Sequence, residues 1–272
     1  MKVAAAAGDS LRPRPRGVVI LIYHRVGGGA RSEIDLPAVA FEQQMAWLAD
    51  SGRVISLDDA VDVLEAPEAS DPSDLSLVPS HNPVVVTFDD GTADLAEIAL
   101  PILVRYEVPA TVYLATKYVD DQLTWPAEGV PLSWSGAQEM VASGLITMGS
   151  HTHSHALLDR IRPQDAADEL DRSRQLIEDK LGVEARHFAY PKAVAPTSLK
   201  VEALVGERFR SAALAGNRPN LYGSTNVHRL ARTPIQVSDG QRFFRRKAVG
   251  GMAMEDSFRR RINRVRYRDA TG

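Results

Sequence analysis

The chain has 272 residues, of which 44% are hydrophobic and 25% are charged. This composition is typical of an ordinary globular protein with a sizeable core. Because the sequence contains no cysteine, disulfide bonds and thiolate metal sites are excluded. Any metal site would have to use histidine, aspartate and glutamate side chains.

The first residues do not resemble a secretory signal peptide. Residues 1–16 contain a short run of alanines, followed by proline, arginine and other polar residues where an apolar segment should continue. We therefore expect a flexible N-terminus over residues 1–16 and a cytoplasmic protein. The next apolar run, at 17–23, is too short to span a membrane and is predicted to be a buried strand.

From residue 17 onwards, β-rich apolar runs alternate with helical patterns. Strands are predicted at 17–23, 84–88, 111–115, 145–149, 187–190, 211–214 and 230–237. Helices are predicted at 40–50, 57–65, 92–105, 135–143, 163–181 and 196–205. The alternation predicts an α/β fold with a parallel sheet and helices outside it. About seven strand–helix units favour a barrel over residues 17–250, and an open doubly wound sheet is the alternative.

The helix predicted at 163–181 illustrates the signals used. Pro163 stands at its start, apolar and small residues recur at helical spacing, and Gly182 follows as a stop. Residues 66–83, in contrast, are rich in proline, serine and aspartate, which predicts a surface loop and not a domain boundary.

The C-terminal part of the chain is strongly basic. The formal net charge is −3, but residues 241–272 hold ten arginines and lysines against three acidic residues. A basic helix is predicted at 251–272, with a narrow apolar stripe formed by Met254, Phe258, Ile262 and Val265. Such a helix could pack on its own domain, or it could contact an anionic membrane surface or a nucleotide-linked substrate. No basic face with interleaved aromatic residues indicates a nucleic-acid partner.

Functional residues of parallel α/β folds gather where strands end. The positions to consider are therefore His24, the pair Asp89–Asp90, residues 150–155, residues 190–192 and residues 228–232. The segment TFDDG by itself is explained by a turn with Gly91 at positive φ. A phosphatase-type Asp-x-Asp loop fails here, because the nucleophile would fall on Phe88.

Three histidines lie within five residues at the end of the strand predicted at 145–149. His151 and His155 are four residues apart and could hold one ion across a single turn, whereas in an extended segment His153 could compete. Imidazoles together with a carboxylate are ligands that suit zinc and leave a position open for water. The competing interpretation is a helix N-terminus with incidental histidines.

With these motifs the sequence resembles the NodB-like polysaccharide deacetylase family (carbohydrate esterase family 4). TFDDG is similar to the first motif of the family, HTHSH at 151–155 to the second, and FAYP at 188–191 to the third motif of one branch. The segments LIYHRV, ALPILVRYEVPATVYL and HRLARTPI also resemble that branch. The resemblance covers roughly residues 17–247.

The resemblance implies a distorted (β/α) barrel of about seven parallel strands with outer helices, and it implies roles for individual residues. Asp90, His151 and His155 would bind a divalent metal, most often zinc. Asp89 would be the general base that takes a proton from the metal-bound water. The backbone amide of Lys192 would stabilise the oxyanion.

Three positions depart from the family pattern. The arginine that commonly orients the base in the third motif is Ala189 here, and the aromatic-glycine pair after the proline is Lys192-Ala193. The late Leu-x-His that supplies the general acid has no clear match. His228 is the nearest candidate for the acid.

Further residues of that branch are expected to contact the substrate. Arg232 matches a basic residue typical of the branch, and Tyr190 and His24 are expected at the substrate site together with it.

The resemblance therefore implies a metal-dependent hydrolase that removes an N-acetyl group from an amino sugar. The substrate would be a glycan precursor, a lipid-linked sugar or a small glycosylated metabolite. One alternative is an amidase of the same fold that acts on another small amide. The other is a degenerate, non-catalytic barrel used for binding.

Overall fold

The computed structural model describes residues 15–27, 29–30, 32–66, 81–126 and 129–252. The basic helix predicted at 251–272, nearly all of the N-terminal segment 1–16 and most of the loop 66–83 fall outside these ranges. Predictions about those segments, including the contact with a membrane surface, remain predictions. No helix within the described ranges is both long and apolar enough to cross a bilayer.

Seven parallel strands close into a barrel, which confirms the predicted fold class. They are β1 (Gly17–Tyr23), β4 (Val84–Phe88), β5 (Ala110–Leu114), β6 (Ile146–Ser150), β7 (His187–Ala189), β8 (Ser211–Ala215) and β10 (Leu230–Pro234). Neighbours along this order pair in parallel, and β10 pairs back with β1, where Arg232 lies opposite Ile20. The short strand β9 (Asn220–Leu221) pairs antiparallel with the start of β1. The open-sheet alternative is therefore wrong.

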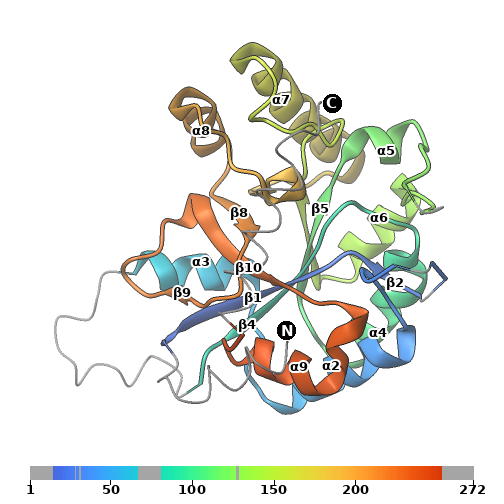
Figure 1. The fold of residues 1–272 in the computed structure, drawn as a ribbon. Helices are drawn as coiled ribbons and strands as arrows, with labels where there is room; N and C mark the ends of the chain where they lie inside the picture. The colour runs from blue at the N-terminus through green and yellow to red at the C-terminus, as the bar shows by residue number, and fades with distance from the viewer. Residues whose placement is uncertain (1–14, 28, 31, 67–80, 127–128, 253–272) are drawn as a thin grey trace.

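Helices cover the outside of this barrel (Figure 1). They are α2 (Ala38–Asp50), α3 (Leu57–Glu65), α4 (Leu100–Arg105) with the π-helical turn η2 (Leu95–Ala99) before it, α5 (Thr116–Asp120), α6 (Trp134–Ala142), α7 (Pro163–Leu181), α8 (Leu199–Gly206) and α9 (Gly240–Ala248). A small pair, β2 (Arg25–Val26) and β3 (Asp35–Leu36), follows β1. Helices α7 and α8 lie side by side, as do α2 and α9.

The long helix α7 shows how sequence signals produce an element of this barrel. Pro163 occupies its first turn, where the missing N–H costs no hydrogen bond. Its buried residues recur every three or four positions and face the barrel: Ala166, Leu170, Ser173 and Ile177. Gly182 ends the helix at φ 68°, a left-handed conformation that glycine adopts without strain.

Alternate residues of each strand point to opposite sides of the barrel wall. On β1, Val19 and Leu21 pack with the outer helices, whereas Val18 and Ile20 belong to a second apolar cluster with Tyr113 of β5. Strands β1 and β5 are not neighbours in the sheet, so their side chains can meet only inside the barrel. The second cluster is therefore the barrel interior. Side chains of α3 join this inner cluster and close the amino end of the barrel.

A polar cluster ties α3 to that closed end. The His187 Nε2 atom lies 3.2 Å from Asp58 Oδ1 of α3, and its Nδ1 lies 2.9 Å from Ser211 Oγ. Arg210 also donates to Asp58, at 3.0 Å. His187 and Ser211 are fully buried, so this Ser-His-Asp set supports the structure and has no access for a substrate. With the amino end closed, the carboxyl end remains for the site.

Candidate active site

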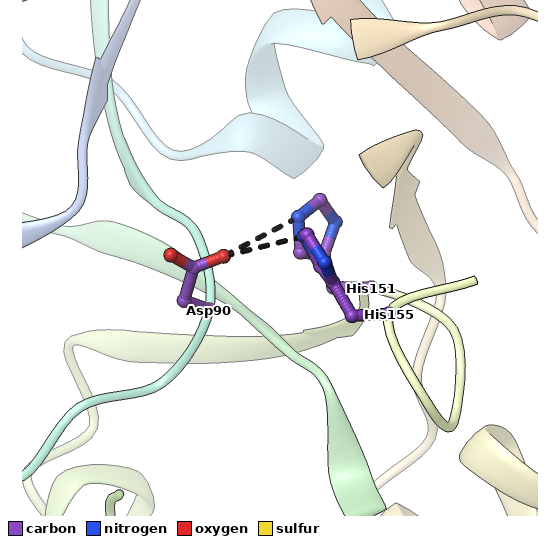
Figure 2. A group of neighbouring side chains, drawn as sticks. All are labelled: Asp90, His151 and His155. Atoms are coloured by element: carbon purple, nitrogen blue, oxygen red, sulfur yellow. Dashed lines mark ion pairs between the residues drawn. The ribbon is translucent and has the colours of Figure 1, made fainter. Parts of the chain in front are cut away.

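The residues that follow β4 and β6 meet at the carboxyl end of the barrel. Asp90 Oδ1 lies 3.7 Å from His151 Nε2 and 3.6 Å from His155 Nε2. Figure 2 shows these two contacts as dashed lines between the side chains. All three side chains come from the ends of strands, as the sequence predicted. The two imidazoles lie together, with ring centroids 4.9 Å apart.

A strained turn aims Asp90 at the histidines. The Gly91 N–H donates to Asp89 O, and Asp90 between them has φ 74°, so the three residues form a γ-turn of the uncommon, strained form. Gly91 itself has φ 89°, and a Cβ atom there would lie 2.7 Å from Leu114 Cδ2. The glycine of the TFDDG motif is therefore required by both the backbone and its neighbour. Strain of this kind is common at functional sites.

His151 is held by a hydrogen bond from its other ring nitrogen. Its Nδ1 lies 2.7 Å from the carbonyl oxygen of Ala189. A carbonyl can only accept, so Nδ1 carries the proton and donates it. The lone pair is then on Nε2, which faces Asp90. The ring is buried and its orientation is fixed from β7.

His155 is placed by its loop. The residue has φ 62°, and the adjacent Ser154 donates from both its N–H and its hydroxyl group to the Glu169 carboxylate of α7, at 2.7 Å each. Burial, followed by the nearby charge of His151, lowers the pKa of His155 to about 3. The ring is therefore neutral at pH 7 and offers a lone pair.

His153 points elsewhere. Its Nδ1 lies 3.0 Å from Thr116 Oγ1 of α5, and the ring is buried. His153 is not part of the group that could hold a metal ion. Among the described residues, that group consists of Asp90, His151 and His155. The segment is therefore neither a regular helix turn nor an extended strand. Its positive φ angles turn the middle histidine away.

The geometry of these three side chains fits a divalent cation. One carboxylate oxygen and two imidazole nitrogens all lie within 4.8 Å of one another. A nitrogen and oxygen donor set of three protein ligands is the usual set of a catalytic zinc site, which keeps a further position open. The neutral state of His155 and the Nε2 lone pair of His151 meet the requirement that ligands be deprotonated.

Asp89 forms a buried ion pair with Arg232. The guanidinium donates from Nη1 to Oδ1 at 2.6 Å and from Nη2 to Oδ2 at 2.9 Å, and it also donates to Thr87 Oγ1. Burial has the largest single effect and acts to raise the pKa of Asp89, but the charge and hydrogen bonds of Arg232, together with the charges of His151 and His24, outweigh it and lower this pKa to about 2. The Arg232 guanidinium lies over the ring of Tyr113, 4.9 Å from its centroid. Asp89 is therefore ionised and held in one orientation.

This ion pair corrects the role predicted for Arg232. The residue was expected to bind substrate, but it is 1% exposed and its donors are directed at Asp89 and Thr87. Arg232 thus orients Asp89 from β10, whereas the position of the arginine common in the third motif of the resembled family is Ala189 here. One sequence signal could have indicated this, since a charged residue within the buried strand LARTP needs a buried partner.

The substrate role predicted for the Tyr190 side chain is also wrong. Tyr190 packs edge-on against Phe188, with ring centroids 5.0 Å apart, in the apolar cluster between the barrel wall and helices α7 and α8. Its neighbour Ala189 faces the interior. Because residues alternate along β7, Tyr190 must point outward, away from Asp90.

His228 lies at the wrong end of the barrel for the predicted general acid. It is part of the short helical turn η4 (Val227–Arg229), which comes before β10, and its Nε2 lies 2.9 Å from Phe209 O just before β8. Since β8 and β10 run parallel to β4, this position is the amino end. Asp89 and Asp90 are at the carboxyl end, so the assignment of His228 as the acid is wrong.

His24 and Lys192, in contrast, lie at the carboxyl end with the site. His24 follows β1 on the inward-facing register, and its charge is among the causes that lower the pKa of Asp89. Burial raises the pKa of Asp90, and the charge of His24 opposes that increase. Lys192 has φ 52°, and the turn that contains it bonds the N–H groups of Ala193 and Val194 to Tyr190 O and Pro191 O. Among the described residues, none accepts from the Lys192 N–H.

Comparison with known proteins identifies the class. Residues 78–206 match the family model of polysaccharide deacetylase. The Bacillus subtilis protein "Putative polysaccharide deacetylase YxkH" is 27% identical over 222 residues, which cover 81% of this chain and 73% of that protein. Both matches are to polysaccharide deacetylases, which are hydrolases that act on carbon–nitrogen bonds.

Two solved structures share the fold. The Streptococcus pyogenes deacetylase PplD in complex with acetate is 19% identical, with a TM-score of 0.72 over 86% of this chain and 99% of that chain. The polysaccharide deacetylase BC0361 from Bacillus cereus is 24% identical, with a TM-score of 0.67 over 86% of this chain and 69% of that chain. In sequence and in fold, the chain is therefore similar to polysaccharide deacetylases.

Proposed function

We propose that the protein is a metal-dependent deacetylase that removes an N-acetyl group from an amino sugar. The observation that carries this proposal is the pairing of two adjacent aspartates with different partners. Asp90 faces His151 and His155 at 3.6–3.7 Å, while Asp89 is held by Arg232. A turn without a function would give no reason for this separation.

Asp90, His151 and His155 would hold the metal, which we propose to be zinc. A bound divalent ion would supply Lewis acidity, which polarises the amide carbonyl and lowers the pKa of a water molecule. This ligand set leaves Asp89 free for proton transfer.

Asp89 would act as the general base. Its bond to Arg232 occupies one lone pair on each carboxylate oxygen, so each oxygen keeps a second lone pair that can accept a proton. A base with a pKa of about 2 in the resting site is ionised throughout the neutral range. Because Arg232 fixes the orientation of the carboxylate, Asp89 would accept the proton from water without moving first.

The remaining steps would use Lys192 and His24. The Lys192 N–H would donate to the carbonyl oxygen as negative charge develops on it. His24 would give a proton to the departing amine, since it is the predicted site histidine at this end of the barrel that is not in the proposed ligand set.

The test is metal analysis of the purified full chain together with acetate release from a panel of N-acetylated amino sugars. We expect about one zinc per chain, acetate release that chelation abolishes, and restoration on adding zinc. Asp89→Asn should keep the metal and lose about 10²–10⁴-fold in turnover. Acetate release that persists without metal, or full activity in Asp89→Asn, would contradict the proposal. A second panel, of non-sugar amides, is assayed in parallel. Hydrolysis of those amides in place of the sugars would identify the alternative amidase.

A further inference from the structure

The two histidines of the candidate metal site are held in different ways. His151 has a carbonyl partner for its Nδ1 atom. Among the described residues, none forms a corresponding hydrogen bond with the second ring nitrogen of His155. The ring contacts Asp90, the His151 ring and the ring of Trp125. A metal-binding histidine normally has its second nitrogen fixed by a hydrogen bond. His155 therefore needs another source of orientation.

Trp125 is positioned to supply it. Its indole lies perpendicular to the His155 ring, with centroids 5.3 Å apart and planes at 88°. On the indole itself, Tyr118 stacks with a centroid distance of 3.7 Å and nearly parallel planes. Edge-to-face and stacked contacts are the favourable geometries of aromatic pairs. The three rings thus form one continuous row of aromatic contacts: Tyr118 stacks on Trp125, and Trp125 contacts the proposed metal ligand His155 edge to face.

This row of rings is fixed to the loop that carries the histidines. Tyr118 lies on α5, where the neighbouring Lys117 N–H donates to His153 O at 2.8 Å and Thr116 Oγ1 lies 3.0 Å from the His153 ring. Helix α5 and the histidine loop are therefore bonded to each other and form one unit. The position of Trp125 relative to His155 is set by this unit and not by the flanking loop alone.

The loop around Trp125 is built to hold the indole inward. Trp125 is 6% exposed although its neighbours Thr124 and Pro126 are exposed. Its N–H and carbonyl both pair with Gly129, where a Cβ atom would lie 2.7 Å from Trp125 Cβ. Glycine at position 129 is thus required for this close approach.

Burial of this indole is not explained by its own hydrogen bonding. The Nε1 atom is buried and has no partner among the described residues, and a buried N–H without an acceptor is unfavourable for stability. Trp134, on the same side of the barrel, does bond its Nε1 to Asp120, at 3.0 Å. A residue retained at a cost beside a metal ligand indicates a role at that site.

We propose that Trp125, braced by Tyr118, is a positioning residue that fixes the His155 ring for metal binding. The inference rests on the metal site of the proposed function. It adds a role for Trp125 and Tyr118, which none of the sequence motifs includes.

The experiment measures zinc affinity of the metal-free full chain by competition with a chromophoric chelator. The variants are Trp125→Leu, which removes the ring, Trp125→Phe, which keeps an aromatic ring without the N–H, and Trp134→Leu as the matched control. Trp125→Leu should raise the Kd for zinc by about 10–100-fold, whereas Trp125→Phe and the control should stay within about threefold of wild type. The visible spectrum of bound Co²⁺ should change in Trp125→Leu and not in Trp134→Leu.

The outcomes separate this inference from the proposed function. If wild type binds no zinc, the proposed metal site itself is wrong. If wild type binds zinc and folded Trp125→Leu binds it equally well, only the role of Trp125 is overturned. Thermal unfolding of each variant shows whether it is folded. Should Trp125→Leu not fold, Tyr118→Leu decides at a partly exposed position: unchanged zinc affinity there overturns the inference, and weakened affinity supports it.

Discussion

The ion pair between Arg232 and Asp89 leads to the most discriminating prediction, the effect of Arg232→Lys. The guanidinium makes two parallel hydrogen bonds, at 2.6 and 2.9 Å, to a carboxylate that is almost fully buried. Lysine keeps the positive charge but offers a single ammonium group in place of the planar fork. Asp89 would remain ionised but would lose its fixed orientation.

The expected magnitude follows from that loss of orientation. Displacement of a catalytic group by about 1 Å can lower the rate by about 10²-fold. We therefore expect kcat of Arg232→Lys to fall by about 10²-fold with KM and zinc content close to those of wild type. Steady-state kinetics on an N-acetylated sugar that wild type hydrolyses, with metal analysis of the same preparation, measures all three quantities.

Stability provides a second measure of the same contact. Arg232→Leu leaves the Asp89 carboxylate buried without its partner, which should lower the free energy of unfolding by about 3–5 kcal/mol. Arg232→Leu combined with Asp89→Asn removes the unpaired charge and should recover a large part of that loss. A double-mutant cycle by urea denaturation of the metal-free chain gives the coupling between the two residues.

Two results would refute this reasoning. If Arg232→Lys raised KM and left kcat unchanged, Arg232 would bind substrate, as the sequence first suggested. If the double variant were no more stable than Arg232→Leu, the buried pair would not be the reason for the destabilisation. In both cases the orientation of Asp89 would need another explanation.

Three further predictions concern single residues. His24→Ala should lower turnover by about 10²–10⁴-fold with metal retained, whereas His228→Ala should leave it nearly unchanged; equal losses in both would contradict the proposed acid. Gly91→Ala should lose 1–3 kcal/mol or more of stability, on the order expected for a strained positive φ, and should weaken zinc binding; normal zinc binding in this variant would show that the turn tolerates a side chain.

Hydrogen bonding to His187, together with nearby arginines, lowers the pKa of Asp58 to about 2, below its unfolded value of about 4, so its stabilisation is present above pH 4 and disappears as the pH falls towards 2. Asp58→Asn should therefore lower the melting temperature at pH 7, with a difference from wild type that narrows on acidification; a constant difference would contradict this assignment.

Much of the barrel could be predicted because its signals are local. The seven strands are apolar runs that are buried on both faces, as in other closed parallel barrels, and the structure places each start within one residue of its prediction. Helix α7 was predicted at its observed bounds because Pro163 and Gly182 mark its ends. Two short helices were missed. Helix α5 has five residues, too few for a period, and α9 is mostly polar and is held to α2 by Phe244 packing on Trp47.

The sequence by itself determined the three side chains that converge at the metal site. Asp90, His151 and His155 each follow a strand, and all parallel strands of a barrel end on the same side, so convergence did not depend on details of packing. The roles of Arg232, Tyr190 and His228 did depend on those details.

Whether a strand residue points inward or outward follows from its register, and whether it is near a site follows from which end of the barrel it occupies. Arg232 therefore reaches Asp89 across the interior, Tyr190 faces the outer helices, and His228 lies at the opposite end from Asp90. The relations of Arg232 to Asp89 and of His228 to Asp90 join residues more than a hundred positions apart, and only the closed barrel brings them to a defined distance. Motifs identified the candidate ligands, and the tertiary structure decided what orients them.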